Sequence, residues 1–244
     1  MRGTEQEVDL GQSTSFTGTG PLRWRVGAGW LVLGGGGSWR ANETGDVDAA
    51  ALGWADLDRP VAVVPTAGMA TDEAEALLEY YADLGGPNGY VVPIFDATGA
   101  QWQENCHLLA EAGLIYLADG PDTLGLVRAL RASPALEGTA RAFEAGAVLL
   151  GMGAGAAVLG DWVGDQGEQR VEPGLGWLPN IIVTPGFKGI EQTRQLRRLL
   201  ELKPNCLGLG VPERTALGLG PGGVVENVGP GQVTVVVSGL EVEG

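Results

Sequence analysis

One glycine-rich stretch of the sequence has the spacing of a catalytic turn. Residues 147–150 form a short apolar run, Ala-Val-Leu-Leu, which is typical of a buried parallel strand. Gly-Met-Gly-Ala-Gly-Ala follows at once at 151–156, and helix-forming residues then return. A strand, a tight glycine turn and a helix in immediate succession form a nucleophile elbow, which presents a Ser or Cys at its tip. The tip residue here is Gly153, so the stretch predicts an elbow without a nucleophile.

Other residue types that could carry nucleophilic chemistry are scarce. The single histidine of the sequence, His107, directly follows Cys106 in a helix predicted over 101–112. Adjacent residues of a helix point about 100° apart, so these two side chains cannot form a Cys–His dyad. We interpret His107 as a structural residue. The usual zinc sites need several His or Cys ligands, and one histidine excludes them.

Carboxylates are the remaining candidates for chemistry. Asp119 and Asp122 share one predicted turn, and Glu213 follows a later strand. Three carboxylates could hold a hard cation, and a pair could activate water. Acids at turns and strand ends more often have local structural roles, so we expect no metal and no other cofactor. The four glycines at 34–37 match neither a dinucleotide-binding nor a phosphate-binding motif.

Composition limits the classes of partner. The 244 residues carry a net charge of −15, which disfavours nucleic acids and anionic membrane surfaces. No apolar run reaches the roughly 18 residues of a membrane span, and the polar first residues do not form a secretory signal. Two cysteines are too few for a disulfide scaffold. We therefore expect a cytoplasmic protein.

The order of elements predicts an α/β fold. We expect an N-terminal extension over 1–22 and one domain over 23–244. Predicted buried strands alternate with helices, which favours three α/β/α layers around a mainly parallel central sheet. The strands are expected at 30–33, 61–67, 90–94, 114–117, 147–150 and 181–183, and the helices at 71–84, 101–112 and 191–201. Two further strands around the Gly-Pro-Gly at 229–231 predict a C-terminal β-hairpin.

The elbow and its surroundings resemble the family of cyanophycinase and aspartyl dipeptidase (peptidase E). Members carry Gly-x-Ser-Ala-Gly-Ala at the elbow, and five of these six positions agree with residues 151–156. The Gly-Leu-Gly-Trp-Leu at 174–178 and the segment 206–217 are similar to further family motifs. The resemblance runs from about Trp30 to Val237. It implies a serine hydrolase scaffold related to class I glutamine amidotransferases, which is flavodoxin-like, and it implies a homodimer.

The resemblance also locates the catalytic positions of the family on this sequence. Gly153 stands at the nucleophile position and Gly186 at the position of the histidine base, so both groups are lost. Glu213 matches the acid of the triad and is its remnant. Asp119 replaces the first glycine of a turn that contributes an oxyanion donor, and Asp122 replaces its glutamine. An acid there would repel a developing oxyanion if it pointed inward, whereas Asp122 is equally well explained as a helix N-terminal acid.

Two functions remain open from the sequence. The first is a catalytically inactive relative that binds a small molecule or a peptide, because glycine at both catalytic positions widens the pocket. The second is a hydrolase that acts on Asp-containing peptides through a relocated site. We favour the first. The residues expected to line the binding pocket are Gly35, Gly36, Asp119, Gly120, Met152 and Ala154.

Overall fold

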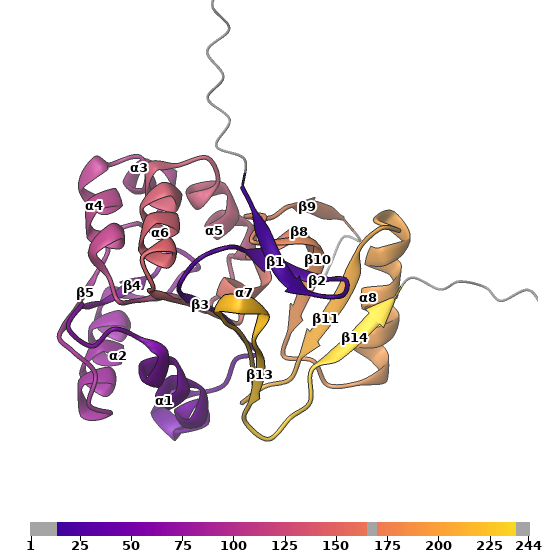
Figure 1. Ribbon diagram of the computed structural model, residues 1–244, viewed down its shortest axis with the longest axis horizontal. Helices are drawn as coiled ribbons and strands as arrows, with labels where there is room; N and C mark the ends of the chain where they lie inside the picture. The colour runs from indigo at the N-terminus through magenta and orange to yellow at the C-terminus, as the bar shows by residue number, and fades with distance from the viewer. Residues whose placement is uncertain (1–13, 165–169, 238–244) are drawn as a thin grey trace, which may run out of the picture.

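A seven-stranded sheet is the centre of the computed structural model, which describes residues 14–164 and 170–237 (Figure 1). Its strand order is β13-β12-β3-β7-β6-β4-β5. The strands from β3 to β5 run parallel, and β12 and β13 continue the sheet antiparallel. In that order the bounds are Val225–Val228, Ala216–Leu219, Trp30–Gly34, Val148–Met152, Leu114–Leu117, Val61–Val64 and Gly89–Val91.

Alternating side chains of this sheet enter two separate hydrophobic cores. Leu31 and Leu33 of β3 face one core, whereas Val32 between them faces the other. The helices α3 to α6 cover the first face, and α1 and α2 cover the second (Figure 1). The predicted three-layer α/β fold with a mainly parallel central sheet is confirmed. The helices are α1 (Gly45–Trp54), α2 (Thr71–Asp83), α3 (Ala97–Ala100), α4 (Gln103–Glu111), α5 (Thr123–Leu130) and α6 (Pro134–Glu144), and a 3₁₀ turn spans Trp39–Ala41.

A second, five-stranded sheet extends the fold beyond what the sequence predicted. Its order is β14-β11-β10-β8-β9, with β8, β10 and β11 parallel and the two outer strands antiparallel. Helix α8 packs on it through a third apolar cluster, and the two are seen together in Figure 1. The bounds are Gly160–Gly164 for β8, Val171–Pro173 for β9, Leu178–Pro185 for β10, Ile190–Leu202 for α8, Leu207–Val211 for β11 and Thr234–Val237 for β14.

The predicted C-terminal β-hairpin is wrong. β13 pairs with β12 in the central sheet, whereas β14 pairs with β11 in the second sheet. The glycines between them serve close packing: a Cβ atom added at Gly229 would overlap the carbonyl oxygen of Arg214, and Gly231 N donates to Thr215 Oγ1 at 2.9 Å. The turn therefore crosses between the sheets, and each strand extends an edge that already exists.

The N-terminal end of the described chain is a β-hairpin. It consists of β1 (Phe16–Thr19) and β2 (Leu22–Arg25), so the expected boundary between 22 and 23 falls inside β2. Trp24 is buried in the first core, and its Nε1 donates to the carbonyl oxygen of Gly220 at 3.2 Å. Gly220 precedes a 3₁₀ turn at Pro221–Gly223. Residues 1–13 lie outside the described chain. Within the described residues no helix has the length and apolarity to span a bilayer.

A buried acid joins α1 to α2. Asp48 is 1% exposed, and its carboxylate accepts hydrogen bonds from Tyr81 at 2.7 Å, Thr44 at 2.7 Å and Tyr80 at 3.1 Å. Burial raises the pKa of Asp48 above its ordinary value, and the three hydroxyl donors oppose that rise.

We predict that Asp48→Asn removes a pH-dependent loss of stability. Because the folded-state pKa is raised, the contribution of Asp48 is complete below the ordinary carboxyl pKa and is lost as the pH rises through the folded value. Urea unfolding at pH 5 and pH 8 should therefore favour the variant over wild type more strongly at pH 8. Asp46→Asn, which removes the same charge from an exposed position of α1, is the control. An equal advantage of Asp48→Asn at both pH values would contradict this account.

Candidate functional site

The predicted elbow is present at the carboxyl end of β7. Gly153 joins β7 to the single helical turn α7 (Ala154–Ala157) with φ 52° and ψ −114°. A residue with a side chain adopts such a conformation only with strain, whereas glycine does so readily. The small neighbours allow close packing, because a Cβ atom added at Gly155 would overlap the carbonyl oxygen of Leu117 in β6. The backbone of a nucleophile elbow is therefore intact.

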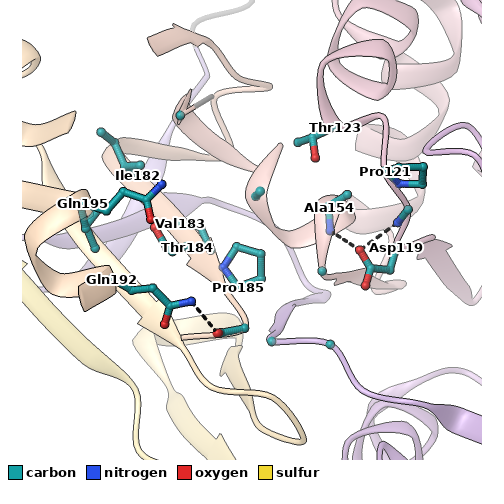
Figure 2. Close-up of a pocket in the computed structure, with 18 of the residues that line it drawn as sticks. Asp119, Pro121, Thr123, Ala154, Ile182, Val183, Thr184, Pro185, Gln192 and Gln195 are labelled. Carbon is teal, nitrogen blue, oxygen red and sulfur yellow. Dashed lines mark hydrogen bonds between the residues drawn. The ribbon is translucent and has the colours of Figure 1, made fainter. Parts of the chain in front are cut away.

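The carboxylate of Asp119 fills the place of the missing nucleophile. It projects from the turn after β6, and its Oδ1 accepts from Ala154 N and from Gly120 N, each at 2.8 Å (Figure 2). A Cβ atom added at Gly153 would overlap Cγ and both oxygens of Asp119. The N–H of the residue after the nucleophile and an N–H from a second turn are the two donors of an oxyanion hole. Ala154 N is the first of these donors by position, and Gly120 N lies in the turn where the family resemblance places the second. Both N–H groups donate here to the protein's own carboxylate.

Asp122, in the same turn, has a structural role. Its Oδ1 accepts from Gly125 N at 2.8 Å, and it is the N-cap residue of α5. The interpretation of Asp122 as a helix N-terminal acid is thus confirmed. A cap of this kind satisfies one of the free N–H groups of the first helical turn.

Gly186 and Glu213, which the resemblance places at the positions of the base and the acid, lie at the ends of strands of the second sheet. Gly186 follows β10 with φ 63°, and its N–H donates to the carbonyl oxygen of Gly35 at 2.8 Å. The nearest atom to a Cβ added there is that same oxygen, at 3.8 Å, so the space for a base side chain is open. Glu213 follows β11 and pairs with Lys188 Nζ at 2.9 Å, with about half of its side chain exposed at 51%. The remnant acid therefore has a lysine partner.

A cavity of about 560 Å³ joins these positions. It brings together Gly153, Gly186 and Glu213 with five of the six residues expected to line a pocket, namely Gly35, Gly36, Asp119, Gly120 and Ala154. The expectation for Met152 is wrong. Its side chain is buried at 2% exposure in the core under α1 and α2, because successive residues of β7 point to opposite faces of the sheet.

Sequence reasoning missed the wall that α8 and α5 contribute. Thr123, Gln192, Gln195, Leu196 and Leu199 all line the cavity. Gln192 Nε2 donates to the carbonyl oxygen of Gly186 at 3.1 Å, and Figure 2 shows both glutamines on the side opposite Asp119. The signal was available only as the amphipathic pattern of 191–201, which does not say that its glutamines face a cavity.

Two other groups named from the sequence lie elsewhere. Cys106 is buried, whereas its neighbour His107 is exposed on α4, so the two do not form a dyad. Cys106 Sγ instead accepts from Arg141 Nη2 at 2.8 Å. Among residues 14–164 and 170–237, no group of three or more His, Cys, Asp or Glu side chains is placed to hold a metal ion.

An elbow at the carboxyl edge of a mainly parallel sheet, with paired oxyanion donors beside it, defines the scaffold of a nucleophile-elbow hydrolase. Comparison with known proteins identifies the family. The model of Peptidase family S51 matches residues 31–224, and the chain belongs to that family.

Relatives of known name agree with this assignment. The chain is 28% identical to a cyanophycinase of Synechococcus elongatus over 191 residues, covering 74% of this chain and 59% of that protein. A cyanophycinase of Geminocystis herdmanii is 26% identical over 190 residues, covering 73% and 70%. The crystal structure of a peptidase from an acI-B1 Actinobacterium superposes with a TM-score of 0.63 at 26% identity, covering 87% of this chain and 95% of that one. This chain thus matches only 59% of the length of the Synechococcus relative.

We predict that Asp119 and Gly153 are energetically coupled. Gly153→Ser should destabilise the protein by more than the roughly 1–3 kcal/mol of backbone strain, because its Cβ also overlaps Asp119. In an Asp119→Gly background the overlap disappears, so the penalty should fall by about 1 kcal/mol or more, as read from a double-mutant cycle of urea unfolding. Gly53→Ser, at an exposed position where an added Cβ meets no atom within 4 Å, is the control. Strict additivity of the Asp119 and Gly153 substitutions would refute the coupling.

Proposed function

We propose that this chain is a member of peptidase family S51 that has lost serine peptidase chemistry and binds a small molecule or a peptide in the cavity. The single observation that supports this most strongly is the position of Asp119. Its carboxylate overlaps the space of a nucleophile side chain and accepts hydrogen bonds from both oxyanion donors. A substrate carbonyl carbon has no attacking group there, and its oxygen has no free donor pair.

The loss extends through every part that acyl transfer needs. A serine hydrolase uses a nucleophile, a base that takes its proton, and donors for the oxyanion. In this chain Gly153 and Gly186 provide no side chain, and Glu213 is paired with Lys188. Loss of the serine or the histidine alone lowers turnover by about 10⁶ in a well-studied protease. The loss of both, with the donors occupied, leaves no efficient route.

Binding needs only what the chain retains. The volume of about 560 Å³ lies within the roughly 300–1,000 Å³ of ordinary ligand sites. The lining combines apolar side chains of α8 with amide, hydroxyl and carboxylate groups. Convergent polar groups around an apolar wall are typical of a site that orients a small ligand or a short peptide.

A hydrolase with a relocated site, acting on Asp-containing peptides, is the second candidate. The observation in its favour is that Asp119 and Glu213 both line the cavity, so either carboxylate could take a proton from water. The names of the relatives, cyanophycinase and peptidase, support the same class of reaction. Activation of water without free oxyanion donors would leave the transition state poorly stabilised. We therefore place this candidate second.

A hydrolysis assay on the purified chain separates the two candidates. The panel comprises Asp-initial dipeptides, isoaspartyl dipeptides and cyanophycin, with Glu213→Ala as the matched variant. We expect neither the wild type nor the variant to release product above a protein-free blank, because the proposed loss of chemistry does not depend on Glu213. Turnover by the wild type above the blank would overturn the proposal, and its disappearance in Glu213→Ala would assign a catalytic role to that acid.

Cellular location and assembly are separate expectations. The cytoplasmic location rests on the low cysteine count of the sequence, and the homodimer rests on the resemblance to the family. Both stay predictions.

A further inference from the structure

The elbow of this chain presents a hydrogen-bond acceptor to the cavity, where the elbow of a hydrolase presents hydrogen-bond donors. In a hydrolase, two N–H groups point to the place where an oxyanion develops. Here Oδ1 of Asp119 accepts hydrogen bonds from both of those groups, at Gly120 and Ala154. Oδ2 accepts no hydrogen bond from the described residues. It lies near Gly36, which also lines the cavity: a Cβ atom added at Gly36 would be 3.6 Å from Oδ2. A ligand at the elbow therefore meets an anionic acceptor.

No basic side chain of the described chain lines the cavity to offset this acceptor. The charged residues of the lining are Asp119, Asp122 and Glu213. Asp122 caps α5 through Gly125 N, and Glu213 is paired with Lys188. Unlike Glu213, Asp119 has no cationic partner among the described residues. Unlike Asp122, which lies at the start of α5, Asp119 lies at the elbow itself. Its charge is therefore the one that a ligand would neutralise.

We infer that the cavity takes a ligand that carries a protonated primary amine, which binds Oδ2 of Asp119. This inference rests on the proposed binding function and specifies its ligand class. A charge-assisted hydrogen bond from an ammonium group to a carboxylate is about twice as strong as a neutral one. The apolar part of the ligand fits the wall that Leu196 and Leu199 contribute. A carbonyl or carboxylate oxygen at the same place would face Oδ2 without a donor and would be repelled.

Three probes of equal length test the charge preference: n-butylamine, 1-butanol and butyrate. Each is titrated into the ¹⁵N-labelled full chain at 150 mM salt, and the amide signals of Gly120 and Ala154 report binding at the elbow. We expect butylamine to bind most tightly and butyrate most weakly. Stronger binding of butyrate than of butylamine by the wild type would overturn the inference.

Asp119→Asn, compared with a control substitution elsewhere, tests whether Asp119 causes the charge preference. Asp119→Asn removes the charge but keeps an oxygen for the two N–H donors, so the fold should persist and butylamine affinity should fall about tenfold, the equivalent of about 1.4 kcal/mol. Glu226→Gln, at an exposed position of β13 outside the cavity, makes the same change in net charge and should leave that affinity unchanged. Equal butylamine affinity in wild type and Asp119→Asn would refute the role of Asp119.

Asp119→Gly should reverse the preference. Without the carboxylate, the N–H groups of Gly120 and Ala154 become free donors. Butyrate should then bind more tightly than butylamine and shift the amide signals of these two residues. Unchanged selectivity in a folded Asp119→Gly variant counts against the inference, and Asp119→Asn decides alone if the glycine variant does not fold. Turnover in the hydrolysis assay would remove the proposed function whatever the ligand charge. Absence of turnover with charge-indifferent binding would remove only the present inference.

Discussion

Two hydrogen bonds to one carboxylate oxygen organise the site. Asp119 lies in the turn after β6, and Ala154 begins the helical turn after the neighbouring parallel strand β7. The Oδ1 atom of Asp119 joins these two strand ends and satisfies N–H groups that a substrate oxygen would use in a hydrolase. The arrangement requires glycine at position 153, because any Cβ there would overlap the carboxylate. Glycine at position 153 and the inward carboxylate of Asp119 are thus structurally linked.

Backbone contacts hold the remaining wall of the cavity. Gly35 N donates to the carbonyl oxygen of Thr215 at 2.9 Å, and the carbonyl oxygen of Gly35 accepts from Gly186 N at 2.8 Å. A Cβ atom added at Gly35 would overlap the carbonyl oxygen of Pro212. These contacts connect the end of β3 in the central sheet with the end of β10 and the loop before β12. All of them are made by backbone atoms, so they do not depend on which side chains stand at the elbow.

The second sheet gives the cavity its apolar wall. α8 packs on that sheet through Leu196, Leu199 and Leu200, and it presents Gln192 and Gln195 to the cavity. The site therefore lies between a central sheet that carries the elbow and a smaller sheet that carries the helix. Ligand sites in open α/β folds lie at the carboxyl ends of the strands, and this one follows that rule. The contribution of α8 adds the hydrophobic surface that the proposed binding function needs.

The sequence by itself determined the features that depend on residue identity and local pattern. Apolar runs predicted the buried strands β3, β4, β6 and β7, and the glycine spacing predicted the elbow. The absence of a nucleophile at Gly153 follows from the residues alone, whereas the assignment of Gly186 to the base position is what the family resemblance implies. Such features need no knowledge of distant contacts, because strand burial and turn geometry are encoded within a few neighbouring residues.

Only the tertiary structure decided how distant segments meet. Asp119 and Ala154 are 35 positions apart, and the pattern of the turn allowed an inward or an outward carboxylate. The Gly-Pro-Gly at 229–231 predicts a hairpin locally, yet β13 and β14 pair with edges of different sheets. Likewise, the surrounding layers decided that the side chain of Met152 points into the core and that the glutamines of α8 point into the cavity. Strand pairing and side-chain approach are set by long-range packing, which a local pattern does not encode.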